Sequence, residues 1–270
     1  MPILNARMYG ATPALRDDWR TLLHWVQARA GLSRAAGWEV IDYDAPAPLS
    51  ALWARPDLGA VMMCGLPFAR QRDRVQIIAA PVPSAPRFGG RPVYFTDLVV
   101  RSDSPAVSLE DTFGGVVGTT VADSMSGCIA LKAHLREQAG ARARYRRVVG
   151  GLVNARGVIE ALAAGRIDVG PLDGWYHDLL RHNDPAFAAQ VRTIATTRAW
   201  PIPAFVAATS IEPDVVIRLR EALLAAADAP ELVTPLARLL LAGFCVPDPD
   251  SYDVLSVLAD GVADFMEDVT

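Results

Sequence analysis

Two serines and a glycine stand close together where an apolar segment gives way to a helical pattern. They belong to the run Asp123-Ser124-Met125-Ser126-Gly127, which follows the apolar residues 115–121. The first turn of a helix offers backbone N–H groups without intrahelical partners, and the helix dipole favours negative charge there. Gly127 lets a ligand approach the backbone closely. The run therefore predicts an anion-binding turn formed by Ser124, Met125, Ser126 and Gly127, with simple helix capping by a serine as the alternative.

Further candidate residues follow other strand-like segments. Tyr9 comes after the first such segment and Cys64-Gly65 after the third, while Tyr94 begins a long apolar strand and Trp200 lies in a later returning segment. Aromatic walls with a few polar groups are typical of small-molecule sites. The alternatives are structural: Tyr9 at the edge of the core, Cys64 as a small buried side chain, and Trp200 as a packing residue.

Asp173 follows the strand-like residues 167–172 and is the remaining candidate for the site. It can cap the next helix, or it can face the ligand. A carboxylate beside an anion-binding turn repels a dianion. If Asp173 faces the site, the ligand should therefore offer it a proton or a cation, as a zwitterion or a protonated oxyanion does.

Composition excludes several classes of protein. The chain has 270 residues, 51% of them hydrophobic and 21% charged, with a net charge of −4. This is a globular composition without the basic patches of a nucleic-acid-binding protein. Three cysteines that are far apart in the sequence and four histidines show no metal-ligand spacing and no disulfide framework, so we expect no metal. No apolar run is long enough to span a bilayer.

The sequence offers no recognisable catalytic set. Neither Ser124 nor Ser126 has a histidine at a characteristic spacing in the sequence. A histidine that is distant in the sequence and brought close by the fold remains an alternative. Glycine-rich cofactor motifs and nucleophile-elbow motifs are missing from the sequence. We therefore expect no catalytic residues and no cofactor.

Strand-like and helix-like segments alternate, which predicts an α/β fold with mostly parallel sheets. Thr12 should cap a helix that starts at Pro13, and Asn154 should cap another that ends near Gly165. The predicted strands are 3–9, 38–43, 60–63, 75–82, 93–100, 115–121, 145–149, 167–172, 191–197 and 204–208. The later predicted helices are 175–180, 213–227, 232–241 and 252–266.

Several of these elements occur in the order of a known family. They are Val-Arg-Ser-Asp-Ser-Pro within residues 96–105, Asp-Ser-Met-Ser-Gly at 123–127, Ala-Ala-Gly-Arg-Ile-Asp-Val at 163–169 and Leu-Asp-Gly at 172–174. Over most of residues 9–208 the chain resembles the PhnD-like, phosphonate-binding group of type II substrate-binding proteins of ABC transporters. The elements are specific only in combination.

The resemblance implies a type II periplasmic-binding-protein fold with two α/β lobes, two crossing segments and a ligand cleft between the lobes. Residues 1–95 with 204–270 would form one lobe, and 96–203 the other. It also implies that the serine turn receives the acidic head of the ligand, with Asp173 and Tyr9 contributing. The expected ligand is a small anion such as a phosphonate, a phosphate ester or a related oxyanion, and the expected partner is an ABC permease.

Other functions stay open on the same scaffold. One is a cytoplasmic enzyme of cofactor biosynthesis, and another is a ligand-sensing module that acts on a protein partner. The compartment also stays open: we expect the periplasm if a signal segment precedes Met1, and the cytoplasm if Met1 is the native start. No nucleic-acid partner is expected.

Overall fold

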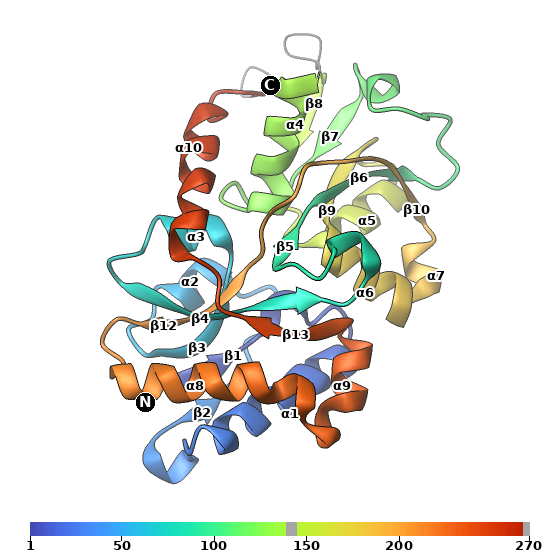
Figure 1. Ribbon diagram of the computed structural model, residues 1–270. Coiled ribbons are helices and arrows are strands. Elements are labelled where there is room, and N and C mark those ends of the chain that lie inside the picture. The colour runs from blue at the N-terminus through green and yellow to red at the C-terminus, as the bar shows by residue number, and fades with distance from the viewer. Residues whose placement is uncertain (139–144, 267–270) are drawn as a thin grey trace. The chain divides into compact units, whose positions relative to one another are not determined.

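A computed structural model describes residues 1–138 and 145–266 (Figure 1). The chain divides into two compact units, which we call unit 1 (Met1–Val93 with Pro201–Tyr252) and unit 2 (Tyr94–Trp200 with Asp253–Thr270). The chain passes between the units within β5 (Val93–Tyr94), within β11 (Trp200–Pro201) and after Tyr252. There are thus three crossings where we expected two.

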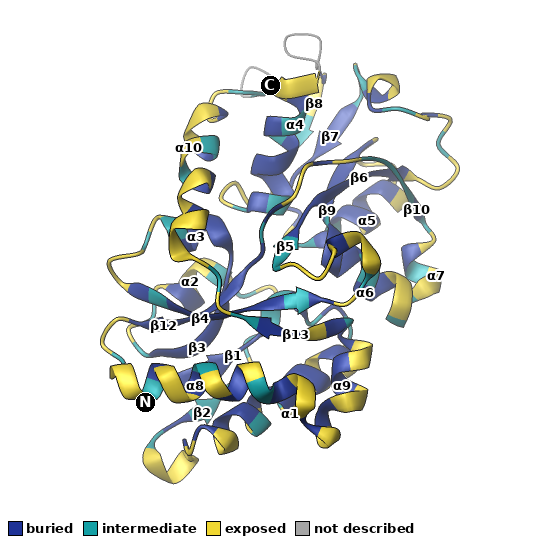
Figure 2. Ribbon diagram, viewed as in Figure 1, coloured by how far each residue is buried: buried dark blue, intermediate teal, exposed yellow. Residues whose placement is uncertain are grey.

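Unit 1 contains a six-stranded sheet in the order β13-β4-β12-β3-β1-β2. The strands are β1 (Ile3–Asn5), β2 (Glu39–Val40), β3 (Leu58–Met63), β4 (Val75–Pro83), β12 (Ala204–Ala208) and β13 (Leu241–Cys245). Strand β1 runs parallel to β2 and β3, whereas β12 runs antiparallel to both β3 and β4, and β13 antiparallel to β4. All residues of β3 and β12 are buried, as expected for central strands covered on both faces (Figure 2).

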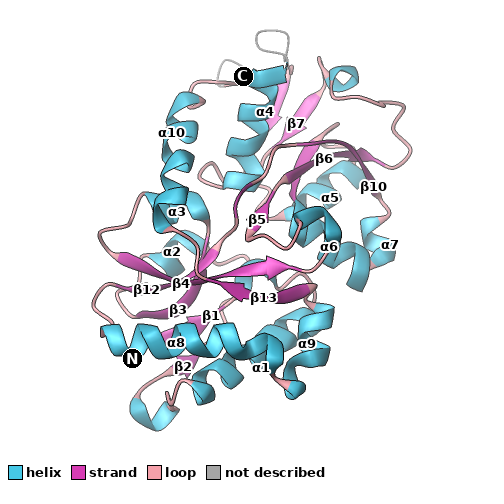
Figure 3. Cartoon of the chain, in the orientation of Figure 1, coloured by secondary structure: helices cyan, strands magenta, loops and turns pink. Residues whose placement is uncertain are grey.

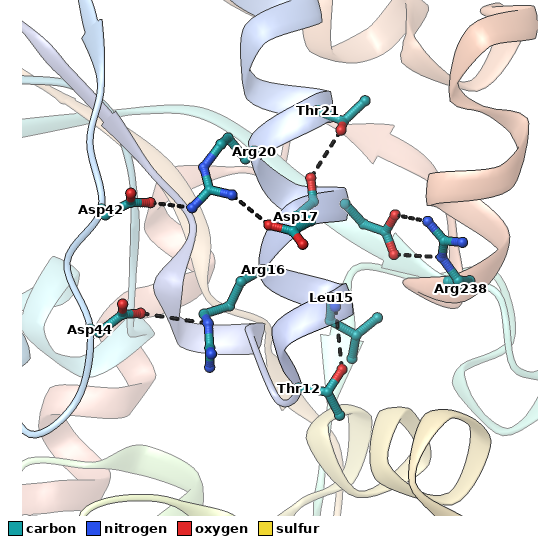
Figure 4. Close-up of polar contacts among 10 residues, drawn as sticks. Thr12, Leu15, Arg16, Asp17, Arg20, Thr21, Asp42, Asp44 and Arg238 are labelled. Carbon is teal, nitrogen blue, oxygen red and sulfur yellow. Dashed lines mark hydrogen bonds and ion pairs between the residues drawn. The ribbon is translucent and has the colours of Figure 1, made fainter.

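Five helices belong to unit 1: α1 (Pro13–Arg29), α2 (Leu49–Trp53), α3 (Gly65–Ala69), α8 (Pro213–Ala225) and α9 (Val233–Arg238). Helix α1 packs against α8 and α9, and α2 packs on β3. The predicted start of α1 is confirmed, because Thr12 accepts a hydrogen bond from the Leu15 N–H at 3.3 Å and Pro13 is the first helical residue (Figure 4). The cap satisfies one of the backbone donors at the helix start.

Unit 2 is built around the antiparallel sheet β10-β6-β9, formed by β10 (Val191–Thr196), β6 (Thr96–Arg101) and β9 (Gly170–Asp173). A parallel pair, β7 (Val116–Gly118) and β8 (Arg147–Val149), is linked to this sheet through a parallel bridge between Val117 and Val169. Leu98, Val100 and Leu131 are core residues of the unit and expose 0% of their surface.

The described helices of unit 2 are α4 (Ala130–Gln138), α5 (Ala155–Ala163), α6 (Gly174–Asn183), α7 (Pro185–Ala188) and α10 (Asp253–Gly261). Helices α4, α5 and α6 contact strands of the central sheet, and α7 packs on α6. The predicted cap of α5 is confirmed by a 3.2 Å hydrogen bond from the Gly157 N–H to the side chain of Asn154. Helix α10 contacts the turn before α4, and Lys132 donates to the Ala263 carbonyl at 3.0 Å. This packing places the C-terminal segment with unit 2, whereas the expected lobes put 204–270 together.

The α/β class of the fold is confirmed, but the prediction of mostly parallel sheets is wrong. The central strand of unit 2, β6, is antiparallel to both neighbours, and β12 and β13 give the sheet of unit 1 three antiparallel pairings. Alternation of strands and helices favours parallel crossovers. The alternation does not reveal the direction of a strand such as β12, which follows the return of the chain from unit 2 and runs antiparallel to its neighbours.

Several predicted elements have different boundaries, and the differences at 3–9 and 232–241 matter most for the candidate site and for the sheet of unit 1. The strand at 3–9 ends at Asn5, whose side chain accepts from the Arg7 N–H at 3.0 Å and donates to the Ile41 carbonyl at 2.9 Å. Tyr9 therefore lies in the 3-10 turn η1 (Arg7–Tyr9). The helix predicted at 232–241 ends at Arg238, and Leu241 begins β13, which the sequence analysis missed (Figure 3). A short apolar run is ambiguous between helix and strand.

Candidate functional site

The predicted anion-binding turn forms a closed loop after β7. The Thr120 N–H donates to the Gly127 carbonyl at 2.9 Å, and the Gly127 N–H donates to the Ser124 hydroxyl at 3.1 Å. The capping alternative is therefore confirmed for Ser124. Its hydroxyl holds the turn together, and Ser126 is left as the serine whose hydroxyl makes no contact in the described hydrogen-bond network.

The helix begins with a π-helical turn, η5 (Met125–Ile129). The Ser124 carbonyl accepts two N–H groups at 3.1 Å each, from Cys128 and from Ile129. Among the described residues, no acceptor faces the backbone N–H groups of Met125 and Ser126. Single π turns occur frequently at functional sites. Two backbone donors and the half-buried Ser126 hydroxyl can therefore bind an anion here.

Gly127 is required by close packing in the same turn. A Cβ atom at this position would lie 1.8 Å from the Thr120 hydroxyl oxygen and 2.8 Å from the Thr120 Cβ. Thr120 is 6% exposed, and its hydroxyl has no hydrogen-bond partner among the described residues. Close approach of two chain segments, rather than a positive φ angle, explains the glycine.

Asp173 ends β9 and caps α6. Its Oδ1 accepts hydrogen bonds from the N–H groups of Trp175 and Tyr176, both at 3.0 Å. The capping alternative is thus confirmed, and Asp173 remains half-buried rather than fully enclosed. Its contact with a ligand stays a prediction.

Thr96 connects Asp173 with the serine turn. It pairs with Asp173 in the register of β6 and β9, and its hydroxyl donates to the Ser126 carbonyl at 2.9 Å. The main chain of Thr96 is held by Thr197: the Thr96 N–H donates to the Thr197 hydroxyl at 3.0 Å, and the Thr96 carbonyl accepts from the Thr197 N–H at 2.9 Å. The structure therefore brings together the two predicted elements, Ser124–Gly127 and Asp173, within unit 2.

This part of unit 2 lies at the carboxyl ends of parallel strands. Strands β7 and β8 are parallel, and β7 is bridged in parallel to the residues that precede β9. The Gly151 N–H donates to the Thr120 carbonyl at 2.9 Å, which joins the loops that follow β7 and β8. Ligands of α/β proteins bind at this edge of a sheet.

The aromatic candidates of unit 2 are both buried. Tyr94 is 1% exposed and lies two residues before Thr96, while Trp200 is 5% exposed and follows β10. The guanidinium of Arg198 lies 4.1 Å from the centre of a Trp200 ring and 3.5 Å from the Glu137 carboxylate. The Trp200 indole N–H has no acceptor among the described residues. Ligand contacts of Tyr94 and Trp200 stay predictions.

The three other candidates belong to unit 1. Tyr9 and Cys64 are buried, with 1% and 5% exposure, and Gly65 begins α3. They follow the parallel neighbours β1 and β3, so they share the carboxyl edge of that sheet. The alternative of a small buried side chain is confirmed for Cys64, since this residue is buried inside unit 1. Their contacts with a ligand stay predictions.

A small depression also occurs in unit 1 between α1 and the loop after β2. Its cavity volume is about 40 Å³, well below the roughly 300 Å³ of a small ligand pocket. Arg20 pairs with Asp17 at 2.5 Å and with Asp42 at 2.6 Å, and Arg16 lies 3.7 Å from Asp44 (Figure 4). These ion pairs tie the loop to α1.

The chemistry of the turn favours binding over nucleophilic attack. Burial raises the pKa of the Cys128 thiol, and the Asp123 carboxylate adds to this effect while Lys132 opposes it. A thiol that stays protonated is a poor nucleophile. Within residues 1–138 and 145–266, no group of three or more His, Cys, Asp or Glu side chains is arranged to hold a metal ion.

Two features of unit 2 were missed by sequence reasoning. They are Thr96 and the buried pair of Asp97 and His177, none of which has a role in the sequence analysis. The signal for Thr96 and Asp97 lies in the strand-like stretch 93–100, where a threonine and an aspartate interrupt an apolar run, whereas His177 has no such signal. Buried charged residues are almost always paired.

The sequence matches the family model of the periplasmic phosphonate substrate-binding proteins of ABC transporters over residues 56–252, and the chain belongs to this family. It is therefore a solute-binding protein, and the resemblance noted from the sequence is confirmed. No curated protein matches the sequence. None of the described helices combines the length and apolar character needed to cross a membrane.

Solved structures show the same fold. The Xanthomonas citri protein XAC2383 bound to ATP is 24% identical, with a TM-score of 0.70 over 98% of this chain and 99% of that one. A binding protein component of an ABC phosphonate transporter from Pseudomonas aeruginosa is 18% identical, with a TM-score of 0.77 over 97% and 88%. PhnD1 from Prochlorococcus marinus in complex with methylphosphonate is 14% identical, with a TM-score of 0.78 over 97% and 98%.

Proposed function

We propose that the protein captures a small anion bearing a phosphonate, phosphate-ester or related oxyanion group and delivers it to an ABC permease in the periplasm. The anionic head binds the backbone N–H groups of Met125 and Ser126 and the Ser126 hydroxyl. The single observation that carries this proposal is the hydrogen bond from Thr96 to the Ser126 carbonyl, because it fixes this turn beside Asp173.

The energetics of such a site suit a transport protein. A hydrogen bond to a charged group contributes about 1.5–3 kcal/mol. Three or four of them give roughly 5–10 kcal/mol, and a micromolar dissociation constant corresponds to about 8 kcal/mol. The ligand in the PhnD1 complex, methylphosphonate, is of the proposed class, and the ATP of the XAC2383 structure contains a phosphate ester.

The carboxylate of Asp173 narrows the ligand class. A fully ionised dianion next to this half-buried carboxylate would be repelled. A monoprotonated phosphonate or a zwitterionic aminoalkylphosphonate offers the carboxylate a hydrogen-bond donor. We therefore favour a ligand whose anionic head binds Ser126 and whose proton or ammonium group binds Asp173.

Isothermal titration calorimetry tests the ligand class with methylphosphonate, 2-aminoethylphosphonate, phosphate and methanesulfonate. We expect heat with both phosphonates and loss of binding in the double variant Ser126→Ala/Asp173→Ala. The matched control is Ser102→Ala/Asp103→Ala, which changes two exposed residues of the same unit and should bind normally. Absence of heat with every member of the panel would reject the proposed ligand class.

We also propose that the protein binds its ligand without converting it. The raised pKa of the Cys128 thiol supports this. Mass spectrometry of each phosphonate after long incubation with the protein should recover it unchanged. A product formed in proportion to protein concentration would favour the enzyme alternative.

A further inference from the structure

Asp97 and His177 form a fully buried polar pair in unit 2. Both side chains have 0% exposure, and the His177 Nδ1 lies 2.8 Å from the Asp97 Oδ2. The Thr196 hydroxyl, on the neighbouring strand β10, donates to the Asp97 Oδ1 at 2.9 Å. Asp97 therefore links the central strand β6 both to β10 and to helix α6.

The contacts of His177 define its tautomer. The Nε2 atom is buried and has no hydrogen-bond partner among the described residues. A proton on Nε2 would leave a buried donor without an acceptor and would turn the Nδ1 lone pair toward a carboxylate oxygen. The ring proton therefore lies on Nδ1, from which it is donated to Asp97.

This pair lies opposite the candidate site across the same strand. Thr96 and Asp97 are consecutive residues of β6, so their side chains point to opposite faces of the sheet. Thr96 reaches the Ser126 carbonyl, while Asp97 reaches α6 through His177. Since Asp173 caps α6 and His177 follows it by four residues, the capped helix is fastened to the strand that holds the serine turn.

We propose that Asp97 and His177 are positioning residues that fix the Asp173 carboxylate relative to the Ser124–Gly127 turn, and so determine how strongly the site prefers an aminoalkylphosphonate over an alkylphosphonate. This inference rests on the proposed function. The anionic head is bound by the three donors of the turn and gives Asp173 at most a neutral hydroxyl proton, whereas the ammonium group depends on its charge contact with Asp173. Disturbing the pair should therefore weaken the second contact and spare the first.

The test compares the dissociation constants of methylphosphonate and 2-aminoethylphosphonate in matched variants. His177→Leu removes the donor to Asp97, and His177→Asn keeps a donor close to the position of Nδ1. Thr196→Val is a milder change that removes a second donor to Asp97. The control Arg238→Leu likewise removes a donor from a buried aspartate, since Arg238 pairs with Asp18 in unit 1 (Figure 4).

We expect the preference of His177→Leu for the amino ligand to fall about tenfold, with methylphosphonate affinity changed by no more than about threefold. Thr196→Val should show a smaller loss, while His177→Asn and Arg238→Leu should keep the preference of the native protein. If His177→Leu does not fold, the two dissociation constants are compared in Thr196→Val instead. Nitrogen-15 NMR should show the Nδ1–H tautomer of His177.

Several results would overturn the inference. One is an unchanged preference for the amino ligand in folded His177→Leu and in Thr196→Val, and another is an equal loss of this preference in Arg238→Leu. An Nε2–H tautomer of His177, or a native protein that binds both phosphonates equally well, would also overturn it. A native protein that binds neither phosphonate would reject the proposed function itself. That outcome is distinguished by the first titration, before any variant is made.

Discussion

The side chain of Thr120 occupies the space that any side chain at position 127 would need. The distance from a Cβ at position 127 to the Thr120 hydroxyl oxygen would be 1.8 Å, far below a van der Waals contact. The N–H group of Thr120 also donates to the Gly127 carbonyl at 2.9 Å, so the two segments cannot move apart without breaking the turn. The shape of the candidate anion site therefore depends on this glycine.

Replacing Gly127 by alanine should abolish phosphonate binding and lower the melting temperature. The clash involves the Thr120 Cβ at 2.8 Å as well as the hydroxyl, so Thr120→Ala should restore neither property fully. Calorimetry and thermal unfolding measure the two effects. Gly261→Ala is the control, because among residues 1–138 and 145–266 its Cβ would meet only the Arg136 side chain, at an ordinary 3.7 Å. Normal binding by Gly127→Ala would show that the turn does not hold the ligand.

Thr96→Val should weaken phosphonate binding about tenfold with a smaller effect on the fold. Valine has nearly the same shape, but it cannot donate to the Ser126 carbonyl, and a lost hydrogen bond costs about 0.5–1.5 kcal/mol. The backbone N–H of Thr96 still reaches the Thr197 hydroxyl. Titration with methylphosphonate measures the effect, and Thr96→Ser, which keeps the hydroxyl, should bind like the native protein. Equal affinity of both variants would contradict the role of Thr96.

Tyr145 should make unit 2 sensitive to alkaline pH. Burial raises its pKa to about 12, although the hydrogen bond with Thr112 works in the opposite direction. Because the pKa in the folded protein exceeds the ordinary value of about 10, the stability contributed by neutral Tyr145 is present below pH 10 and is lost as the pH rises from about 10 to 12.

Tyr145→Phe should therefore unfold more easily at pH 7, by about 0.5–1.5 kcal/mol, and lose less stability than the native protein above pH 10. The Thr112 hydroxyl keeps its bond to the Leu109 carbonyl at 2.6 Å, so little else changes. Urea unfolding between pH 7 and 11.5 measures both effects. Tyr43→Phe, which removes a solvent-exposed hydroxyl contact in unit 1, is the control for the loss of a tyrosine hydroxyl. Identical slopes for Tyr145→Phe and the native protein would contradict this account.

The parts of the structure that depend on neighbouring residues were predictable from the sequence. The caps at Thr12 and Asn154 follow from residue type and position, and so does the serine turn, because a strand, a short polar run and a helix stand in direct succession. The α/β class follows from the alternation of such elements.

The parts that depend on distant residues were not predictable. Thr96 and Asp173 are 77 residues apart and meet only through the antiparallel register of β6 and β9. Asp97 and His177 are 80 residues apart, so their pairing has no local signature. The strand direction of β12 and the placement of α10 with unit 2 likewise arise from the path of the whole chain.

A crystal structure of the protein grown with methylphosphonate tests the central claim most directly. We predict phosphonate oxygens within about 3 Å of the backbone nitrogens of Met125 and Ser126, with the Ser126 hydroxyl as a third donor. A phosphonate bound elsewhere, with those N–H groups facing solvent or other protein atoms, would contradict the account.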